Sequence, residues 1–237
     1  HFANCEPHRK RIIQMGESPE RVFNVGDTSV DNIKSVSLMS LEELEKSINI
    51  DLVGKKIVIV TFHPVTTQEN NSEQVLELVN AMKNFPEYLF IITKANADAG
   101  GIIINQTWED VVKDYDNMHL VSSLGMKRFL SLLNNSVMML GNSSSGLIEA
   151  PTFGIPTVNI GDRQKGRIRG ASVIDCSSEK NEIIEAMKKA VTPEFQNIAE
   201  NAEKIFGDGR ASEQIVEIIK ETVANRKVVM PKHFYDI

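Results

Sequence analysis

The sequence predicts an α/β fold in which a doubly wound parallel sheet carries helices on both faces. Short apolar runs rich in β-branched residues recur along the chain, and stretches with helical spacing separate them one by one. The chain has 237 residues, of which 41% are hydrophobic and 24% are charged. This is enough for one large domain or for one and a half smaller ones.

Each element follows from its own pattern. The runs expected to form strands buried on both faces cover 55–62, 88–93, 118–121, 136–140, 155–160 and 171–175. The stretches with helical spacing cover 71–85, 107–115, 126–135, 144–153, 179–191 and 211–223. This alternation is typical of a doubly wound parallel sheet.

The first residues do not continue this series. Residues 6–16 are expected to form a helix that ends at a glycine, and residues 21–26 a strand. We therefore expect three parts: 1–36, the last βαβ portion of a preceding domain with its linker; 37–225, the main α/β domain; and 226–237, a C-terminal tail. The chain begins without Met or a signal-peptide pattern, so we expect it to be a piece of a longer protein.

Composition excludes several classes of partner. The net charge is −6 and the chain has no dense Lys/Arg tract, so a nucleic acid is a poor candidate for its main partner. An anionic small ligand remains possible, because a local site can be basic on an acidic protein. No apolar stretch approaches the roughly 20 residues that span a bilayer. Cys5 and Cys176 fit no metal or redox spacing, which favours reduced thiols in a cytoplasmic protein without a metal.

The stretch "GNSSSG" (141–146) follows an apolar strand and precedes a helical stretch. A Walker A loop would need Lys after its last glycine, but Leu147 stands there, and no register supplies the Gly-x-Ser-x-Gly of a nucleophile elbow. Two interpretations remain. Ser143 and Ser144 donate to a phosphate at a helix N-terminus, or the loop is a plain turn with a serine N-cap.

Glu149 and His63 are candidates with open alternatives. Glu149 follows on the same helix and suits a ribose with two hydroxyls, or it is a solvated surface residue. His63 ends the first strong strand, where an imidazole can bind phosphate or sugar and transfer protons. The alternative is a structural histidine beside a proline turn.

Two further loops follow strands at the same predicted edge of the sheet. One carries Asn96 and Asp98, and the other carries Arg163, Lys165, Arg167 and Arg169. Four cations on one short loop indicate neutralisation of a diphosphate, although a solvated basic loop is the alternative. The stretch "FGDGRAS" (206–212) lacks the third glycine of a dinucleotide motif and is expected to start a helix. Together the residues indicate a nucleoside diphosphate, or its sugar conjugate, at the carboxyl edge of a Rossmann-like domain.

With "FHPVTT", "NADAGG", "GNSSSGLIEAPTFGIPTVNIGDRQKGR" and "GDG" in that order, the chain resembles the UDP-N-acetylglucosamine 2-epimerase family. It looks closest to the hydrolysing branch, which makes N-acetylmannosamine for sialic-acid-type sugars. The resemblance runs from residue 11 through the final helix. It implies two Rossmann-like domains of GT-B type with the active site between them, this chain being the C-terminal, UDP-holding one.

The resemblance also implies roles for individual residues. His63 matches a histidine implicated in catalysis or phosphate handling. The residues implied to bind UDP are Ser143 and Ser144 at the diphosphate, Glu149 at the ribose, Arg163 near the phosphates, and Asn96, Val121, Ser122 and Ser123 around the nucleotide. Some relatives carry Lys-His where this chain has Ser122 and Ser123, so those two side chains differ from the family pattern.

The implied reaction converts UDP-N-acetylglucosamine and water to N-acetylmannosamine and UDP, without cofactor, in a cytoplasmic homodimer. The carboxylates that transfer protons are expected in the N-terminal domain, so this chain alone is expected to bind UDP weakly and to be inactive. Three alternatives stay open: a non-hydrolysing 2-epimerase, the donor-binding domain of a GT-B glycosyltransferase, and a non-catalytic sensor of nucleotide sugars.

Overall fold

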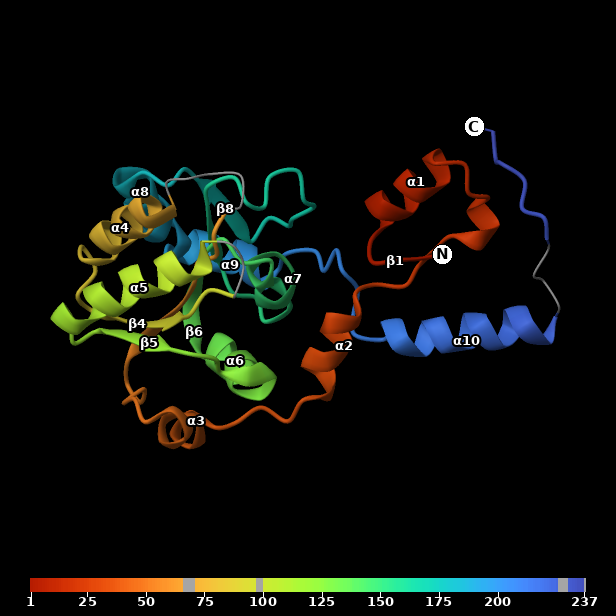
Figure 1. Cartoon of the computed structure of the whole chain (residues 1–237). Helices are drawn as coiled ribbons and strands as arrows, with labels where there is room; N and C mark the ends of the chain where they lie inside the picture. Colours follow the sequence, from red (N-terminus) through yellow and green to blue (C-terminus); the bar gives the residue numbers. More distant parts are fainter. Residues whose placement is uncertain (66–70, 97–99, 226–229, 237) are drawn as a thin grey trace. The chain divides into compact units, whose positions relative to one another are not determined.

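The computed structural model describes residues 1–65, 71–96, 100–225 and 230–236 (Figure 1). The chain divides into two compact units. One contains residues 37–202, and the other combines residues 1–36 with residues 203–237.

The unit of residues 37–202 is an α/β domain. Its strands are β3 (Lys56–Thr61), β4 (Tyr88–Thr93), β5 (Met118–Val121), β6 (Ser136–Gly141), β7 (Thr157–Ile160) and β8 (Val173–Cys176). Its helices are α3 (Leu41–Ile48), α4 (Asn71–Met82), α5 (Gly101–Val111), α6 (Gly125–Asn134), α7 (Ser145–Thr152), α8 (Lys180–Ala190) and α9 (Pro193–Glu200), with the 3-10 turn η2 (Val112–Asp114). Each predicted strand is present, which confirms the predicted fold class.

All six strands pair in parallel, in the order β5-β4-β3-β6-β7-β8. Numbered within this sheet, the order is 3-2-1-4-5-6, which is that of the Rossmann fold. The chain starts at the centre with β3, builds outward to β5, and returns to place β6 on the other side of β3. The strand order therefore reverses between β3 and β6, and such a switch point is where doubly wound sheets bind their ligands.

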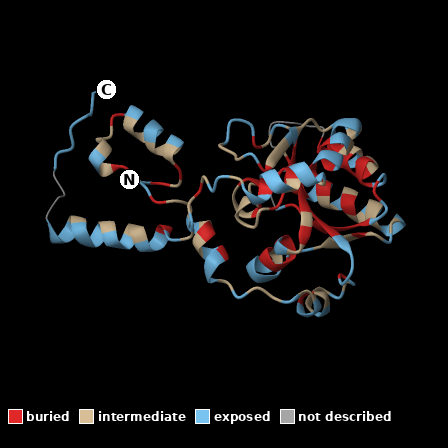
Figure 2. Cartoon of the chain, turned by 180° about the vertical axis from the view of Figure 1, so that it is seen from behind, coloured by how far each residue is buried: buried red, intermediate tan, exposed pale blue. Residues whose placement is uncertain are grey.

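The sheet is covered on both faces because successive residues of a strand point to opposite sides. In β3, Val58 and Val60 belong to a core cluster with α4, α5 and α8. Ile57 and Ile59 belong to a second cluster, on the other face, with α3, α6 and α7. The buried residues, drawn in red in Figure 2, accordingly concentrate in the strands and on the helix faces that cover them. Each such side chain stabilises the fold by about 1.5–3 kcal/mol.

Helices α5 and α9 differ from the sequence prediction. The helix expected over 107–115 begins at Gly101 instead, because Ile104 and Trp108, one turn apart on the same side, are both buried against the sheet. Helix α9 was not predicted. It carries a start signal in Thr192, whose side chain accepts a hydrogen bond from the backbone N–H of Phe195 and which precedes a proline at the first helical position.

The other unit contains the expected βαβ segment. Strands β1 (Phe2–Ala3) and β2 (Phe23–Asn24) pair in parallel around helix α1 (Glu6–Gln14) and the 3-10 turn η1 (Pro19–Arg21). Helices α2 (Thr28–Ser35) and α10 (Ala211–Ala224) complete the unit. That 1–36 belongs to a preceding domain, and that 37–225 and 226–237 are the remaining parts, stay predictions.

The stretch "FGDGRAS" leads into helix α10, as predicted. The carboxylate of Asp31 on α2 accepts hydrogen bonds from the backbone N–H groups of Ala211 (2.9 Å) and Ser212 (2.6 Å). It thereby satisfies two N–H groups of the first helical turn and joins α10 to α2. None of the helices in the described part of the chain is long and apolar enough to cross a membrane.

Candidate functional site

The centre of the carboxyl edge lies where β3 and β6 end side by side. Their last paired residues are Thr61 and Gly141. Gly141 has φ +130°, and a Cβ atom added to it would lie 2.0 Å from the carbonyl oxygen of Thr61. Only glycine fits there, because both the backbone angle and the close approach exclude a side chain. The first glycine of "GNSSSG" thus lets the serine loop begin directly against β3.

The serine loop leads into helix α7, which begins at Ser145, one residue after the predicted start. The Ser143 hydroxyl oxygen accepts a hydrogen bond from the Ser145 N–H (3.3 Å), so its own proton can still be donated. Ser144 is the N-cap residue, and its side chain makes no capping hydrogen bond. Glu149 lies one turn further along α7, on the side of Ser145, and is half-buried. This geometry suits an anion at the helix N-terminus.

The last glycine of the motif lets α7 pack closely on β7. A Cβ atom on Gly146 would meet the Cγ2 methyl of Thr157 at 2.5 Å. The Thr157 hydroxyl also donates to the Gly146 carbonyl oxygen (2.8 Å). The position of the helix N-terminus at the sheet edge therefore depends on this contact.

His63 lies beside the serine loop and is only 8% exposed. Its backbone pairs with the side chain of Asn142, the residue between Gly141 and the serines. The backbone N–H of Asn96, after β4, points at Nδ1 of the imidazole (3.4 Å). Nδ1 is therefore an acceptor, and the neutral ring carries its proton on Nε2. The predicted residues His63 and Asn96 are thus brought together.

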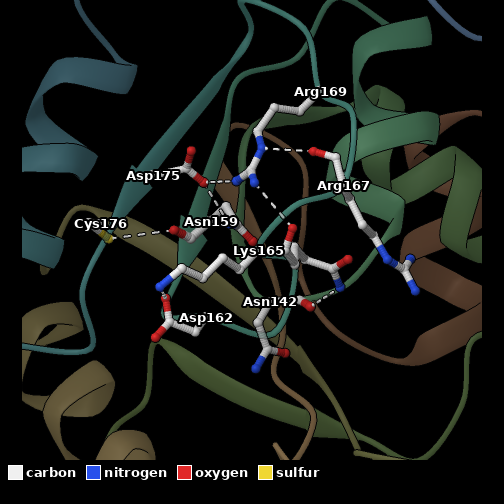
Figure 3. A network of polar contacts seen from close by, with 9 residues as sticks. Asn142, Asn159, Asp162, Lys165, Arg167, Arg169, Asp175 and Cys176 are labelled. Atoms are coloured by element: carbon white, nitrogen blue, oxygen red, sulfur yellow. Dashed lines mark hydrogen bonds and ion pairs between the residues drawn. The ribbon is translucent and has the colours of Figure 1, made fainter. Parts of the chain in front are cut away.

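The basic loop after β7 separates into different roles. Arg163 donates from Nη1 to the Asn142 carbonyl oxygen (3.1 Å), which brings its guanidinium to the serine loop. Arg169 forms an ion pair with Asp175 and donates to the Gln164 carbonyl oxygen (3.1 Å) (Figure 3). Lys165 lies 3.6 Å from Asp162 on the surface. Arg169 and Lys165 therefore pair with carboxylates, and Arg163 contacts the backbone of the serine loop.

The remaining predicted contacts lie at the end of β5. Val121 pairs with Thr93 of β4, and the exposed Ser122 and Ser123 follow it. The Ser123 hydroxyl oxygen accepts a hydrogen bond from the Gly125 N–H (3.3 Å) at the start of α6. Parallel strands lie about 4.8 Å apart, so the edge from β5 to β7 spans about 19 Å. This is long enough to receive an extended nucleotide.

Sequence reasoning missed the asparagines that hold these loops. Asn142 pairs with the backbone of His63, Asn71 with that of Val65, and Asn105 with that of Ala95. For Asn142 and Asn71 the available signal was an asparagine just beyond a strand or at a helix start, where its amide can replace a backbone partner, whereas Asn105 lies inside α5. The candidate Asp98 lies outside the described residues.

The two cysteines are unsuited to nucleophilic chemistry. Burial raises the pKa of both thiols, and for Cys176, with added repulsion from Glu182 and Asp175, to about 12. A thiol with such a pKa is inert at neutral pH. In the part of the chain that the structure describes, no three His, Cys, Asp or Glu side chains gather as a metal site would require.

The fold and this edge define a Rossmann-like domain whose carboxyl edge has a geometry that suits an anion. The chain belongs to the UDP-N-acetylglucosamine 2-epimerase family, whose sequence profile matches residues 1–220.

Named relatives agree with this family. Over the whole of this chain, 36% of residues are identical to the polysialic acid biosynthesis protein P7 of Escherichia coli, of which 60% is covered. The identity is 34% to the hydrolysing GDP/UDP-N,N'-diacetylbacillosamine 2-epimerase of Campylobacter jejuni, again over the whole chain and 61% of the relative. The chain therefore spans about three fifths of the length of these relatives.

Solved structures share the fold. The UDP-GlcNAc 2-epimerase of Neisseria meningitidis, solved with UDP-GlcNAc, superposes with a TM-score of 0.80 at 21% identity, covering 93% of this chain and 61% of that one. The S. aureus MnaA–UDP structure gives a TM-score of 0.76 at 20% identity, covering 100% and 63%.

Proposed function

We propose that this chain is the UDP-binding half of a hydrolysing UDP-N-acetylglucosamine 2-epimerase, which converts UDP-N-acetylglucosamine and water to N-acetylmannosamine and UDP. One observation carries the proposal. His63, the serine loop and Arg163 follow three different strands, β3, β6 and β7, and meet at the switch point of the sheet. His63 and Arg163 form hydrogen bonds with Asn142, and the serines come directly after it in the chain. The similarity of the whole chain to a relative named as a hydrolysing 2-epimerase supports the same function.

The proposed role of these groups is to bind UDP and to stabilise it as a leaving group. The Ser143 and Ser144 hydroxyls and the N-terminus of α7 donate to the diphosphate, and Arg163 neutralises its charge. Glu149 accepts hydrogen bonds from the ribose hydroxyls, and Asn96 with residues 121–123 surrounds the nucleotide. Since charge builds up on the diphosphate as the C1–O bond breaks, these donors lower the barrier most when they are already in place.

In the proposed reaction a base removes the proton at C2 of the sugar while UDP departs from C1. Water then adds to the unsaturated sugar, with the new proton on the opposite face of C2. His63, with its proton on Nε2, is proposed to donate to the departing phosphate or to the sugar. We assign the C2 base to carboxylates of the full-length enzyme in the part of the relatives that this chain does not span.

One alternative to the hydrolysing reaction has support among the relatives. Other relatives are named UDP-N-acetylglucosamine 2-epimerase without the word hydrolysing, at 30% identity in Neisseria meningitidis. A non-hydrolysing enzyme would return UDP-N-acetylmannosamine. Product analysis of the full-length protein, proposed to be a cytoplasmic homodimer, separates the two: free sugar and UDP, or an intact nucleotide sugar. Supplying UDP-N,N'-diacetylbacillosamine in parallel tests which sugar is preferred.

Calorimetric titration of this chain with UDP tests the binding site. We expect binding that Ser143→Ala, Glu149→Ala and Arg163→Ala each weaken by about tenfold, the loss of one hydrogen bond to a charged group or within a buried site. Lys165→Ala is the matched control, because Lys165 is paired with Asp162 on the surface. Equal affinity in all four variants would refute the assigned site.

A further inference from the structure

Asn142 joins three loops at the carboxyl edge and is only 1% exposed. The His63 N–H donates to its side-chain oxygen Oδ1 (2.7 Å), and its Nδ2 donates to the His63 carbonyl oxygen (2.8 Å). Its backbone N–H donates to the Thr61 carbonyl oxygen (3.0 Å). Its own carbonyl oxygen accepts from Arg163 Nη1 (3.1 Å) and Gln164 Nε2 (2.7 Å). The loops after β3, β6 and β7 are therefore held through one residue.

The pairing with His63 continues the sheet beyond its last backbone pair. Strands β3 and β6 separate after Thr61 and Gly141, and the side-chain amide of Asn142 then supplies the donor and acceptor that a strand would supply. A primary amide offers both groups, whereas a carboxylate offers acceptors only. Aspartate at this position would place an oxygen against the His63 carbonyl oxygen.

The backbone that follows is held in the same way. The Val65 N–H donates to Asn71 Oδ1 (2.7 Å), and Asn71 Nδ2 donates to the Val65 carbonyl oxygen (3.3 Å). Two amides thus fix the residues on either side of Pro64. With the backbone fixed, the imidazole of His63 keeps its Nδ1 in reach of the Asn96 N–H (3.4 Å).

We propose that Asn142 is a positioning residue: its amide fixes the backbone of His63, and so holds the imidazole as the Nε2–H tautomer beside the serine loop. The consequence for UDP rests on the proposed function, because His63 is there the proton donor to the phosphate or sugar. The effect of Asn142 on the backbone and tautomer of His63 does not depend on any ligand.

The test uses Asn142→Asp, which keeps the size and the acceptor but removes the donor to His63. Asn117→Asp is the matched control, since Asn117 Nδ2 donates to the Tyr88 carbonyl oxygen (3.0 Å) at the amino edge of the sheet. Nitrogen-15 NMR of histidine-labelled chain reports the ring tautomer, with His63 assigned by its loss in His63→Gln. Amide hydrogen exchange reports the His63 N–H.

The wild-type chain is expected to show a protected His63 amide and one tautomer. In Asn142→Asp the new carboxylate oxygen repels the His63 carbonyl oxygen, which should open the pair although Oδ1 can still accept. Exchange of the His63 amide should then speed up by about tenfold or more, and the second tautomer should appear. Asn117→Asp should change neither. Wild-type behaviour in Asn142→Asp would overturn the proposal.

If Asn142→Asp does not fold, the wild-type chain alone decides, because an unprotected His63 amide or mixed tautomers would overturn the proposal. Titration with UDP is a separate measurement. Binding that is about tenfold weaker in Asn142→Asp supports positioning for the ligand. Absence of UDP binding by the wild-type chain would refute the proposed nucleotide site, while exchange and tautomer would still decide the role of Asn142.

Discussion

The contact between Gly146 and Thr157 gives a prediction that can be worked out from the structure. Gly146→Ala adds a methyl group 2.5 Å from Thr157 Cγ2, so either the threonine or helix α7 has to move. Overpacking of this kind costs about 1–3 kcal/mol. The gain in helix propensity of Ala over Gly, about 1 kcal/mol, offsets part of it. We expect a net destabilisation of up to about 2 kcal/mol.

Thr157→Ser provides the complementary change. It removes the Cγ2 methyl but keeps the hydroxyl that donates to the Gly146 carbonyl oxygen. Thr157 is buried, so the loss of one methyl group alone should cost about 1 kcal/mol. In the double variant the methyl group added by Gly146→Ala occupies the vacated space, where the next contacts, to Thr157 Oγ1 and Cβ, are 3.3 and 3.4 Å. The two substitutions should therefore compensate each other by about 1–3 kcal/mol.

Urea unfolding followed by the fluorescence of Trp108, the sole tryptophan, measures this double-mutant cycle. Trp108 is fully buried in the same unit as the contact. Additive free energies would refute the reasoning, because they would mean that the two groups do not compete for space. UDP titration of the same four proteins adds a functional test: Gly146→Ala should weaken binding by displacing α7, and the double variant should recover it.

Two predictions concern pH. Burial acts to raise the pKa of Asp31, but its hydrogen bonds with Ser212 and Ala211 outweigh burial and lower the pKa below its ordinary 3.8. The contribution of Asp31 to the free energy of unfolding is thus present above pH 3.8, and it is lost as the pH falls through the pKa of Asp31 in the folded protein. Asp31→Ala should cost about 1–2 kcal/mol at pH 7, measured by urea unfolding, and less in acid; an equal cost at pH 7 and pH 3 would contradict this. Burial raises the pKa of Cys176 to about 12 from 9.0. The contribution of the neutral thiol to the free energy of unfolding is therefore present below pH 9.0 and is lost as the pH rises toward 12. Cys176→Ala should be less sensitive to alkali, and the native thiol should resist iodoacetamide at pH 8; rapid labelling of the folded protein would show this assignment to be wrong.

The elements and the serine loop could be predicted because their signals are local. A run such as "KKIVIVTF" is dominated by apolar, β-branched residues, which indicates a strand buried on both faces, and "GNSSSG" marks the turn from strand to helix. The βαβ start and the beginning of α10 followed from similar signals. The first part of α5 was missed because the burial of Ile104 set where that helix begins. Helix α9 was missed although Thr192 and the following proline supplied a local start signal.

The arrangement of the candidate site was decided by the tertiary structure. An apolar run shows that a strand is buried but not which strand lies beside it, and only the sheet order brings His63 next to Asn142, 79 residues later. The four cations of one loop look equivalent as letters, yet Arg169 pairs with Asp175 while Arg163 turns to the serine loop. The sequence by itself determined which residues reach the carboxyl edge; the order of the strands, set by which faces pack together, determined which of them meet.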